Sequence, residues 1–265
     1  MVRRLREEPR VAQLEVDVPK FSLSRENKAD LFTSFCYHIL FMRCQIPIPF
    51  AQLQKIQENE NENQTFKERS QRRKTIKYIN EVTKIIDSMK YMFLNSLSVP
   101  DSASIMLGAS AQSPREMFTL HFTSSDAGPD ESDNDSTTKT TTKQMEAIRR
   151  RMLQVLVSEW MGGEGKTCLL NVFMAVHLPS IPSGVPPLFS LSIASESLRM
   201  RESFHPKLRR CAPPRLLCNI VESSSELDSD SVIDSDNEKV GGEERGAWFV
   251  SNRAVKALRI PGNKP

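Results

Sequence analysis

The feature that most constrains this chain is an apolar stripe at helical spacing between residues 74 and 97. Its members, separated mostly by steps of three and four, are Ile76, Ile79, Val82, Ile85, Ile86, Met89 and Phe93. Residues at this spacing lie on one face of an α-helix. Because an apolar face of this length is stable only when other elements cover it, the chain must supply a sheet or further helices to form a core.

Two other segments have apolar side chains at helical spacing and predict helices at 26–44 and 144–160. The first ends before the Ile-Pro-Ile-Pro sequence at 46–49, because a residue that precedes a proline disfavours the helical conformation. Gly162 and Gly163 end the second. Three amphipathic helices are therefore expected.

Strands are expected between and after these helices. Residues 102–108 and 116–122 are short apolar segments on either side of a turn, and they predict two neighbouring strands or a hairpin. The further strand candidates are 188–194, 215–221, 248–250 and 255–260. Helices and strands that do not alternate strictly indicate an α+β fold.

Polar segments separate these elements. Residues 57–74 have few large apolar side chains and are interpreted as a linker or a frayed helix start. Residues 123–143 are polar and low in complexity, so they are expected to form a disordered loop. An acidic, serine-rich insert occupies about 222–246, and its serine–aspartate repeats fit either a solvated linker or a target of an acid-directed kinase.

Composition limits the class of protein. The 265 residues are 38% apolar, enough for one core, and we expect one domain over 21–260 with flexible tails at 1–20 and 261–265. No apolar run is long enough to span a membrane or to act as a secretory signal. The longest run, 168–178, is interpreted as a core segment or an insertion. The five cysteines lack close paired spacing, which favours reduced thiols and no bound metal.

A Gly-Lys-Thr triplet at 165–167 resembles the end of a nucleotide-binding P-loop. The full pattern, however, needs a glycine where Trp160 stands, and the triplet follows a predicted helix rather than a strand. The four histidines are scattered over separate segments, and no serine or cysteine near them has the setting of a nucleophile. We therefore expect a protein that is not an enzyme and uses no cofactor. The alternative is an enzyme that hydrolyses ATP and depends on Lys166.

Charge does not identify a partner. The 36 basic and 33 acidic residues leave a net charge of +3. Basic runs such as 149–151 are no longer than those on ordinary solvated helices, and no nucleic-acid-binding module is recognisable. Nucleic acid is therefore not expected as a partner.

Four short phrases, kept in one order, carry a resemblance to a known family. They are LFTSFCYHILFMRCQIPIPFAQL at 31–53, IMLGASAQSPREMFTLHF at 105–122, ESFHPKL at 202–208 and AWFVSNRAVKALR at 247–259. The chain resembles the comet family of HORMA-like adaptors, which bind the closed form of the spindle-checkpoint protein Mad-two (Mad2) and present it to an AAA+ remodelling ATPase. The resemblance implies a HORMA-like α+β domain, in which three helices pack on a mainly antiparallel sheet and a C-terminal safety-belt segment closes on its own domain.

The resemblance also implies site residues. Those that would contact Mad2 are Met42, Arg43, Met152, Leu153 and Leu156, those that would contact the ATPase are Pro206 and Lys207, and the anchors of the safety belt would be Trp248 and Phe249. Residues 161–184 have no counterpart in the resemblance and are interpreted as an insertion.

The function implied is that of a non-enzymatic adaptor, which binds closed Mad2, recruits the ATPase, and so helps to disassemble checkpoint complexes and silence the spindle checkpoint. Its partners would be these two proteins, with no nucleic acid, membrane or metal involved. Residence in the nucleus and cytoplasm, with spindle or kinetochore association in mitosis, follows from these partners. The alternative is a HORMA-like scaffold of a meiotic or chromosome-axis complex, whose belt captures a peptide motif.

Overall fold

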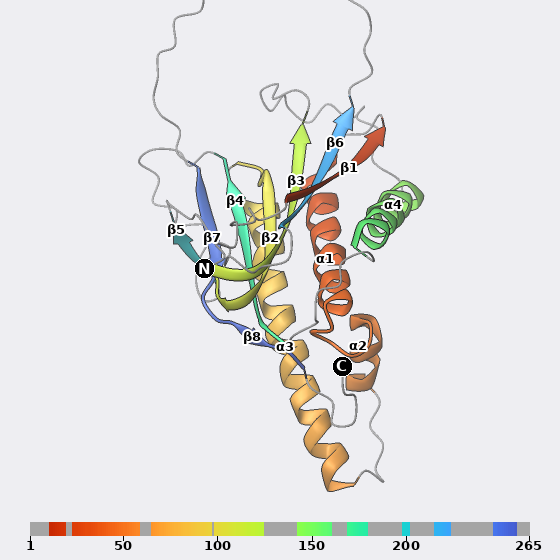
Figure 1. The fold of residues 1–265 in the computed structure, drawn as a ribbon, viewed down its shortest axis with the longest axis vertical. Coiled ribbons are helices and arrows are strands. Elements are labelled where there is room, and N and C mark those ends of the chain that lie inside the picture. The colour runs from red at the N-terminus through yellow and green to blue at the C-terminus, as the bar shows by residue number, and fades with distance from the viewer. Residues whose placement is uncertain are drawn as a thin grey trace, which may run out of the picture.

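A computed structural model describes residues 11–19, 23–58, 65–96, 98–124, 142–160, 169–179, 198–201, 215–223 and 246–258. In this part of the chain, helices pack on a twisted sheet (Figure 1). In chain order the elements are β1 Val11–Pro19, α1 Arg25–Met42, α2 Phe50–Glu58, α3 Phe66–Asn95, β2 Ser102–Ser110, β3 Ser113–Ser124, α4 Thr142–Trp160, β4 Asn171–Leu178, β5 Leu198–Arg201, β6 Arg215–Ser223, β7 Ala247–Ser251 and β8 Val255–Lys256.

The sheet has the strand order β1-β6-β3-β2-β4-β7-β5, and β8 also pairs with β4. Strand β6 runs parallel to both of its neighbours, β1 and β3. The other pairings are antiparallel. The predicted α+β class with a mainly antiparallel sheet is therefore confirmed.

The core lies between the sheet and the helices. The central strands direct every second residue toward the helices, namely Ile105 and Leu107 of β2, Phe118 and Leu120 of β3, and Val172, Met174 and Val176 of β4. Aromatic rings connect the layers: the ring centroids of Phe32 in α1 and Phe93 in α3 lie 6.0 Å apart, and Phe93 meets Phe122 of β3 edge-on at 5.8 Å. Three aromatic side chains thus join two helices to the sheet.

The helices confirm three sequence predictions and correct the expected number. Helices α1 and α4 cover the segments predicted at 26–44 and 144–160, and α3 contains the stripe at 74–97. The described residues contain a fourth helix, α2, which sequence periodicity did not indicate. This helix is short, and of its side chains Phe50 and Leu53 are buried.

Of the two interpretations of residues 57–74, the linker is wrong over 66–74 and the helix start is borne out there, because α3 begins at Phe66 and is 30 residues long. A capping box fixes this start. The backbone N–H of Thr65 donates to Oε2 of Glu68 at 2.8 Å, and the backbone N–H of Glu68 donates to the Thr65 hydroxyl at 3.3 Å. The first half of α3 extends beyond the lower end of the sheet (Figure 1), so it needs no apolar stripe there.

The segment interpreted as an insertion at 161–184 contains a central strand. Residues 171–178 form β4, which pairs with β2 along one edge and with β7 and β8 along the other. Val172, Met174 and Val176 are fully buried. These residues therefore belong to the sheet and the core, while 161–168 and 180–184 lie outside the described residues.

The remaining strand predictions have mixed outcomes. The segments 102–108 and 116–122 form the antiparallel hairpin β2–β3, and 215–221 forms β6. Strand β7 contains 248–250, whereas β8 is shorter than predicted and β5 was not predicted. Residues 11–19 of the expected N-terminal tail form strand β1, which pairs with β6, so the expectation of a flexible tail is wrong over these residues. The strand candidate 188–194, the tail 261–265, the rest of the N-terminal tail, and most of the loop at 123–143 and of the acidic insert lie outside the described residues. Within the described part, no helix combines the length and hydropathy required to cross a membrane.

Gly108→Ala tests the turn of the β2–β3 hairpin. A Cβ on Gly108 would lie 2.7 Å from the backbone nitrogen of Arg115 and 2.8 Å from Cα of Pro114, next to a register shift in the pairing. Since these are backbone atoms, the strands must move apart, and we expect a loss of about 1–3 kcal/mol in the free energy of unfolding. Chemical denaturation measures it; the exposed neighbour substitution Ala109→Ser should change it by less than about 0.5 kcal/mol. Equal stability of both variants would show that the hairpin tolerates a wider turn.

Candidate protein-binding site

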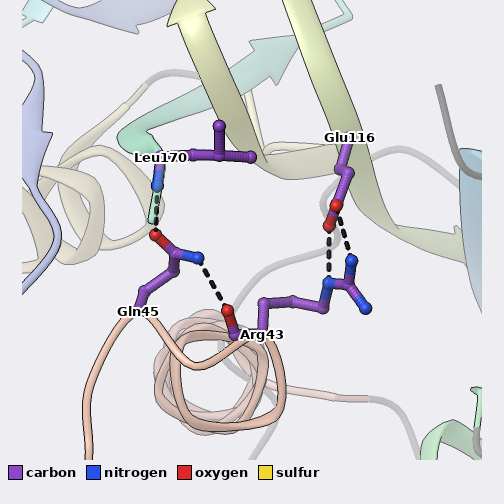
Figure 2. Close-up of polar contacts among 4 residues, drawn as sticks. All are labelled: Arg43, Gln45, Glu116 and Leu170. Carbon is purple, nitrogen blue, oxygen red and sulfur yellow. Dashed lines mark hydrogen bonds and ion pairs between the residues drawn. The ribbon is translucent and has the colours of Figure 1, made fainter. Parts of the chain in front are cut away.

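The C-terminal end of α1 is held by a buried ion pair. The Nε group of Arg43 donates to Oε2 of Glu116 at 2.6 Å, and Nη2 donates to Oε1 at 2.5 Å (Figure 2). The two side chains are only 5% and 3% exposed. A side chain buried this deeply offers almost no surface to a partner, so the structure assigns Arg43 a structural role and not the predicted contact with Mad2. Its neighbour Met42 is half-buried.

Gln45 extends this network to two distant segments. Its Nε2 donates to the backbone oxygen of Arg43 at 2.6 Å, and its Oε1 accepts the backbone N–H of Leu170 at 2.8 Å (Figure 2). The backbone oxygen of Gln45 also accepts the N–H of Leu258 at 2.9 Å. Between Arg43 and Gln45, the backbone of Cys44 has a φ of 51°, a left-handed conformation that turns the chain sharply after α1. The end of α1 thereby fixes both the start of β4 and the end of the C-terminal segment.

Helix α4 presents two different faces. Its buried face, made of Met145, Ile148, Met152 and Leu156, packs into the core, and the helix contacts α1 and β1. Met152 has no exposed surface and Leu156 is 3% exposed. In this conformation neither side chain can touch a partner, so the structure corrects the predicted direct contacts at these two positions.

The outward face of α4 contains a surface hollow of about 650 Å³. The hollow is lined by Glu146, Arg149, Arg150, Leu153, Gln154 and Val157. Leu153 is half-buried, and it is the one predicted residue of α4 that also lines the hollow. We call these six residues the α4 surface. Its apolar centre with charged and amide groups around it is the composition of a protein interface.

Sequence reasoning missed the five residues that line the hollow beside Leu153, and the helical period could have found them. Arg150, Gln154 and Val157 follow the steps of three and four that place them together on the side away from the buried stripe. Two of the residues implied by the family resemblance, Met152 and Leu156, lie on the core face instead, because burial in the core and burial in an interface favour the same residue types.

The predicted belt anchors lie on opposite faces of β7. Phe249 is buried against the helices, whereas Trp248 is half-buried on the other face beside Met106, Met117, Ala175 and Val250. The ring of Trp248 packs on His177 with centroids 5.0 Å apart.

His177 shares a hydrogen bond of 2.8 Å with Asp101. Burial raises the pKa of Asp101, but the hydrogen bond and charge of His177, the hydrogen bond from Ser102 and the charge of His121 together outweigh it, and the pKa is lowered. The predicted ATPase contacts, Pro206 and Lys207, lie outside the described residues.

The titratable groups near α1 do not form a catalytic arrangement. Burial raises the pKa of the Cys36 thiol well above its usual value, so this cysteine stays protonated and unreactive in the core. Burial also lowers the pKa of His38, which favours its neutral form. Within the described ranges, no three His, Cys, Asp or Glu side chains gather as metal ligands would.

The fold and the α4 surface define an α+β protein-binding domain, and comparison with known families makes the class specific. The family model p31comet, described as Mad1 and Cdc20-bound-Mad2 binding, matches residues 8–156, more than half of the 265 residues. The chain belongs to the p31comet family. This family is HORMA-like and non-catalytic, and it implies binding of Mad2 in the spindle checkpoint. No curated protein matches the chain.

Removal of one partner from the Arg43–Glu116 pair should be costly. We expect Arg43→Met to lower the free energy of unfolding by about 3–5 kcal/mol, because it leaves the Glu116 carboxylate buried without its counter-charge. Adding Glu116→Leu should recover part of this loss, which urea denaturation of both variants would measure. Lys77→Met breaks the exposed pair with Glu81, 3.9 Å away, and should change stability by less than about 1 kcal/mol. If the losses in free energy of unfolding caused by Arg43→Met and by Glu116→Leu simply add in the double variant, the two side chains are not coupled.

Proposed function

We propose that this chain is a non-enzymatic adaptor, which binds closed Mad2 through the α4 surface and presents it to an AAA+ remodelling ATPase. The observation that carries the proposal is the division of α4 into a buried face and an outward hollow, within a helix whose residues up to 156 lie inside the family match. A helix with its own face already packed in the core can offer a rigid second face to a partner.

The chemistry of the α4 surface supports a protein partner. Leu153 and Val157 provide apolar contact area, and Arg149 and Arg150 provide long side chains that form hydrogen bonds and pack on a partner. Glu146 makes the charge of the surface mixed. Met42, the last residue of α1, remains a proposed contributor, while Arg43 would act indirectly by holding the end of that helix.

Discrimination between the two forms of Mad2 is central to this role. A ligand with equal affinity for both states selects neither, so the adaptor must bind closed Mad2 more tightly than open Mad2. The ATP chemistry would belong to the partner ATPase. Disassembly of checkpoint complexes, and hence checkpoint silencing, would follow from this presentation in the nucleus and cytoplasm.

We further propose that residues 247–258 act as a safety belt closed on its own domain. Strands β7 and β8 both pair with β4, and the backbone N–H of Leu258 is bound to Gln45. Trp248 and Phe249 would be the anchors on the two faces of β7. A belt engaged in this way leaves the α4 surface, on another part of the domain, as the place for Mad2.

Titration calorimetry against Mad2 variants locked closed and locked open tests the adaptor role. The Arg150→Glu plus Gln154→Glu variant should weaken binding of closed Mad2 at least about tenfold, because both exposed residues lie at the proposed interface. Open Mad2 should bind much more weakly than closed Mad2 to the unmodified chain. Substitution of Met152 is unsuitable here, since a charge in the core would unfold α4.

The matched control is Gln52→Glu plus Lys55→Glu on α2, which makes the same change of charge at exposed positions outside the α4 surface. It should bind closed Mad2 as the unmodified chain does. Equal loss with both variants would indicate a general charge effect, and no binding of either Mad2 form would remove the proposal.

The ATPase contact is tested separately. Lys207→Ala should leave the affinity for closed Mad2 within about twofold but slow ATPase-dependent release of Mad2 at least about tenfold, because it removes a point of contact with the remodelling partner alone. The release rate of labelled Mad2 in the presence of ATP measures this effect, with Arg210→Ala as the neighbouring control. Unchanged release with Lys207→Ala would exclude this lysine from the contact.

A further inference from the structure

A second hollow, of about 640 Å³, lies between α3 and the C-terminal segment. One wall is the α3 stretch from Lys74 to Glu81, the other is the 254–258 segment, and Leu169 and Leu170 lie between them. None of these residues belongs to the α4 surface. We call this hollow the α3 groove. Its volume is that of a site for a small ligand or a few residues of a peptide.

The rim of the α3 groove is basic. Lys74, Lys77 and Lys256 are exposed and line it, and Glu81 is the acidic residue among the lining side chains. Glu81 lies 3.9 Å from Lys77 and offsets part of that charge. The rim therefore favours a ligand with negative charge.

The first half of α3 continues this basic surface beyond the groove. Its basic residues up to the groove are Lys67, Arg69, Arg72, Arg73, Lys74 and Lys77. The acidic residue of its first turn, Glu68, is engaged in the capping box with Thr65. This part of the helix extends away from the sheet (Figure 1), so an extended ligand in the groove could continue along it.

Part of the groove lining is apolar. Leu169 and Leu170 line it with Leu258, which is buried. Tyr78 also lines it, but it is only 3% exposed and its hydroxyl is buried, so this residue forms part of the wall and offers no hydrogen bond to a ligand. Leu169 and Leu170 are the apolar side chains that a ligand can contact.

We propose that the α3 groove binds an extended acidic peptide segment of a partner protein, with one apolar side chain against Leu169 and Leu170. The carboxylates of the peptide would lie along Lys74, Lys77 and Lys256. A nucleic-acid backbone satisfies the lysines but does not use the apolar part of the lining. The basic rim and the apolar lining together therefore select an acidic peptide with an apolar side chain.

Binding at the α3 groove would also stabilise the C-terminal segment. Residues 254–258 form one wall, so the groove is complete only while this segment is packed on β4 and held by Gln45. A ligand that binds only the packed form shifts the equilibrium toward it in proportion to its concentration over its dissociation constant. The partner peptide would thus hold the end of the chain in place.

Fluorescence anisotropy with a defined probe tests this proposal on the full chain. The probe is a fluorescein-labelled peptide with a central leucine between two short runs of glutamate. Saturable binding is expected, and Lys74→Glu plus Lys256→Glu should weaken it at least about tenfold, since each reversal replaces an attraction by a repulsion. A probe with serine in place of leucine should bind several-fold more weakly because it loses the apolar contact.

A melting curve of the Lys74→Glu plus Lys256→Glu variant separates binding from folding. Both lysines are exposed, so their reversal should leave the melting temperature nearly unchanged while the affinity for the probe falls. The Arg150→Glu plus Gln154→Glu variant should bind the probe normally, which keeps this test independent of Mad2 binding. Absence of saturable binding, equal affinity for the leucine and serine probes, or equal competition by an RNA oligonucleotide would each overturn the proposal.

Discussion

The buried pair of Arg43 and Glu116 is the interaction on which the arrangement of this domain depends. Two charges that leave water are tolerated only when their geometry is nearly ideal and their remaining groups are hydrogen-bonded. The pair therefore fixes the end of α1 against β3 in one position, and the left-handed turn at Cys44 then places Gln45. Gln45 in turn holds Leu170 and Leu258, which are 125 and 213 residues away along the sequence. One short turn thus joins four distant parts of the chain.

Most of the fold could be predicted from periodicity, and the failures have physical reasons. The apolar stripes of α1, α3 and α4 and the hairpin β2–β3 depend on local spacing, which the sequence carries directly. The first half of α3 has no stripe because it extends beyond the sheet and is stabilised by its cap and its polar side chains. The run that contains β4 was interpreted as a core segment or an insertion, and its burial bears out the core alternative. The insertion was considered because the family resemblance offered no counterpart, although a continuous apolar run suits a central strand. Pairing such as the parallel contact of β6 with β3 is non-local, and one sequence does not specify it.

The contact residues predicted on α4 lie in part on the face that packs into the core. Met152 and Leu156 are apolar and follow the helical period, and these are also the properties of a core residue. Arg43 has the charge expected of an exposed contact, and only the position of Glu116 shows that its charge is satisfied internally. Arg150, Gln154 and Val157, in contrast, were not selected because nothing in their residue types separates an interface from an ordinary solvated face. Only the burial seen in the structure separates the core residues from the surface residues of α4.

The same division suggests how an adaptor of this kind would work. Helix α4 is packed on α1, and the end of α1 holds Gln45 and, through it, Leu258, so the α4 surface and the C-terminal segment share one rigid support. A surface held in this way cannot adapt much to its partner, because a packed core resists small deformation. Under the proposed function, selectivity for closed Mad2 would then arise from the fixed shape of the α4 surface rather than from a change of shape in this chain. Rigidity also suits a protein that must hold its partner in a defined orientation while a separate ATPase supplies the force.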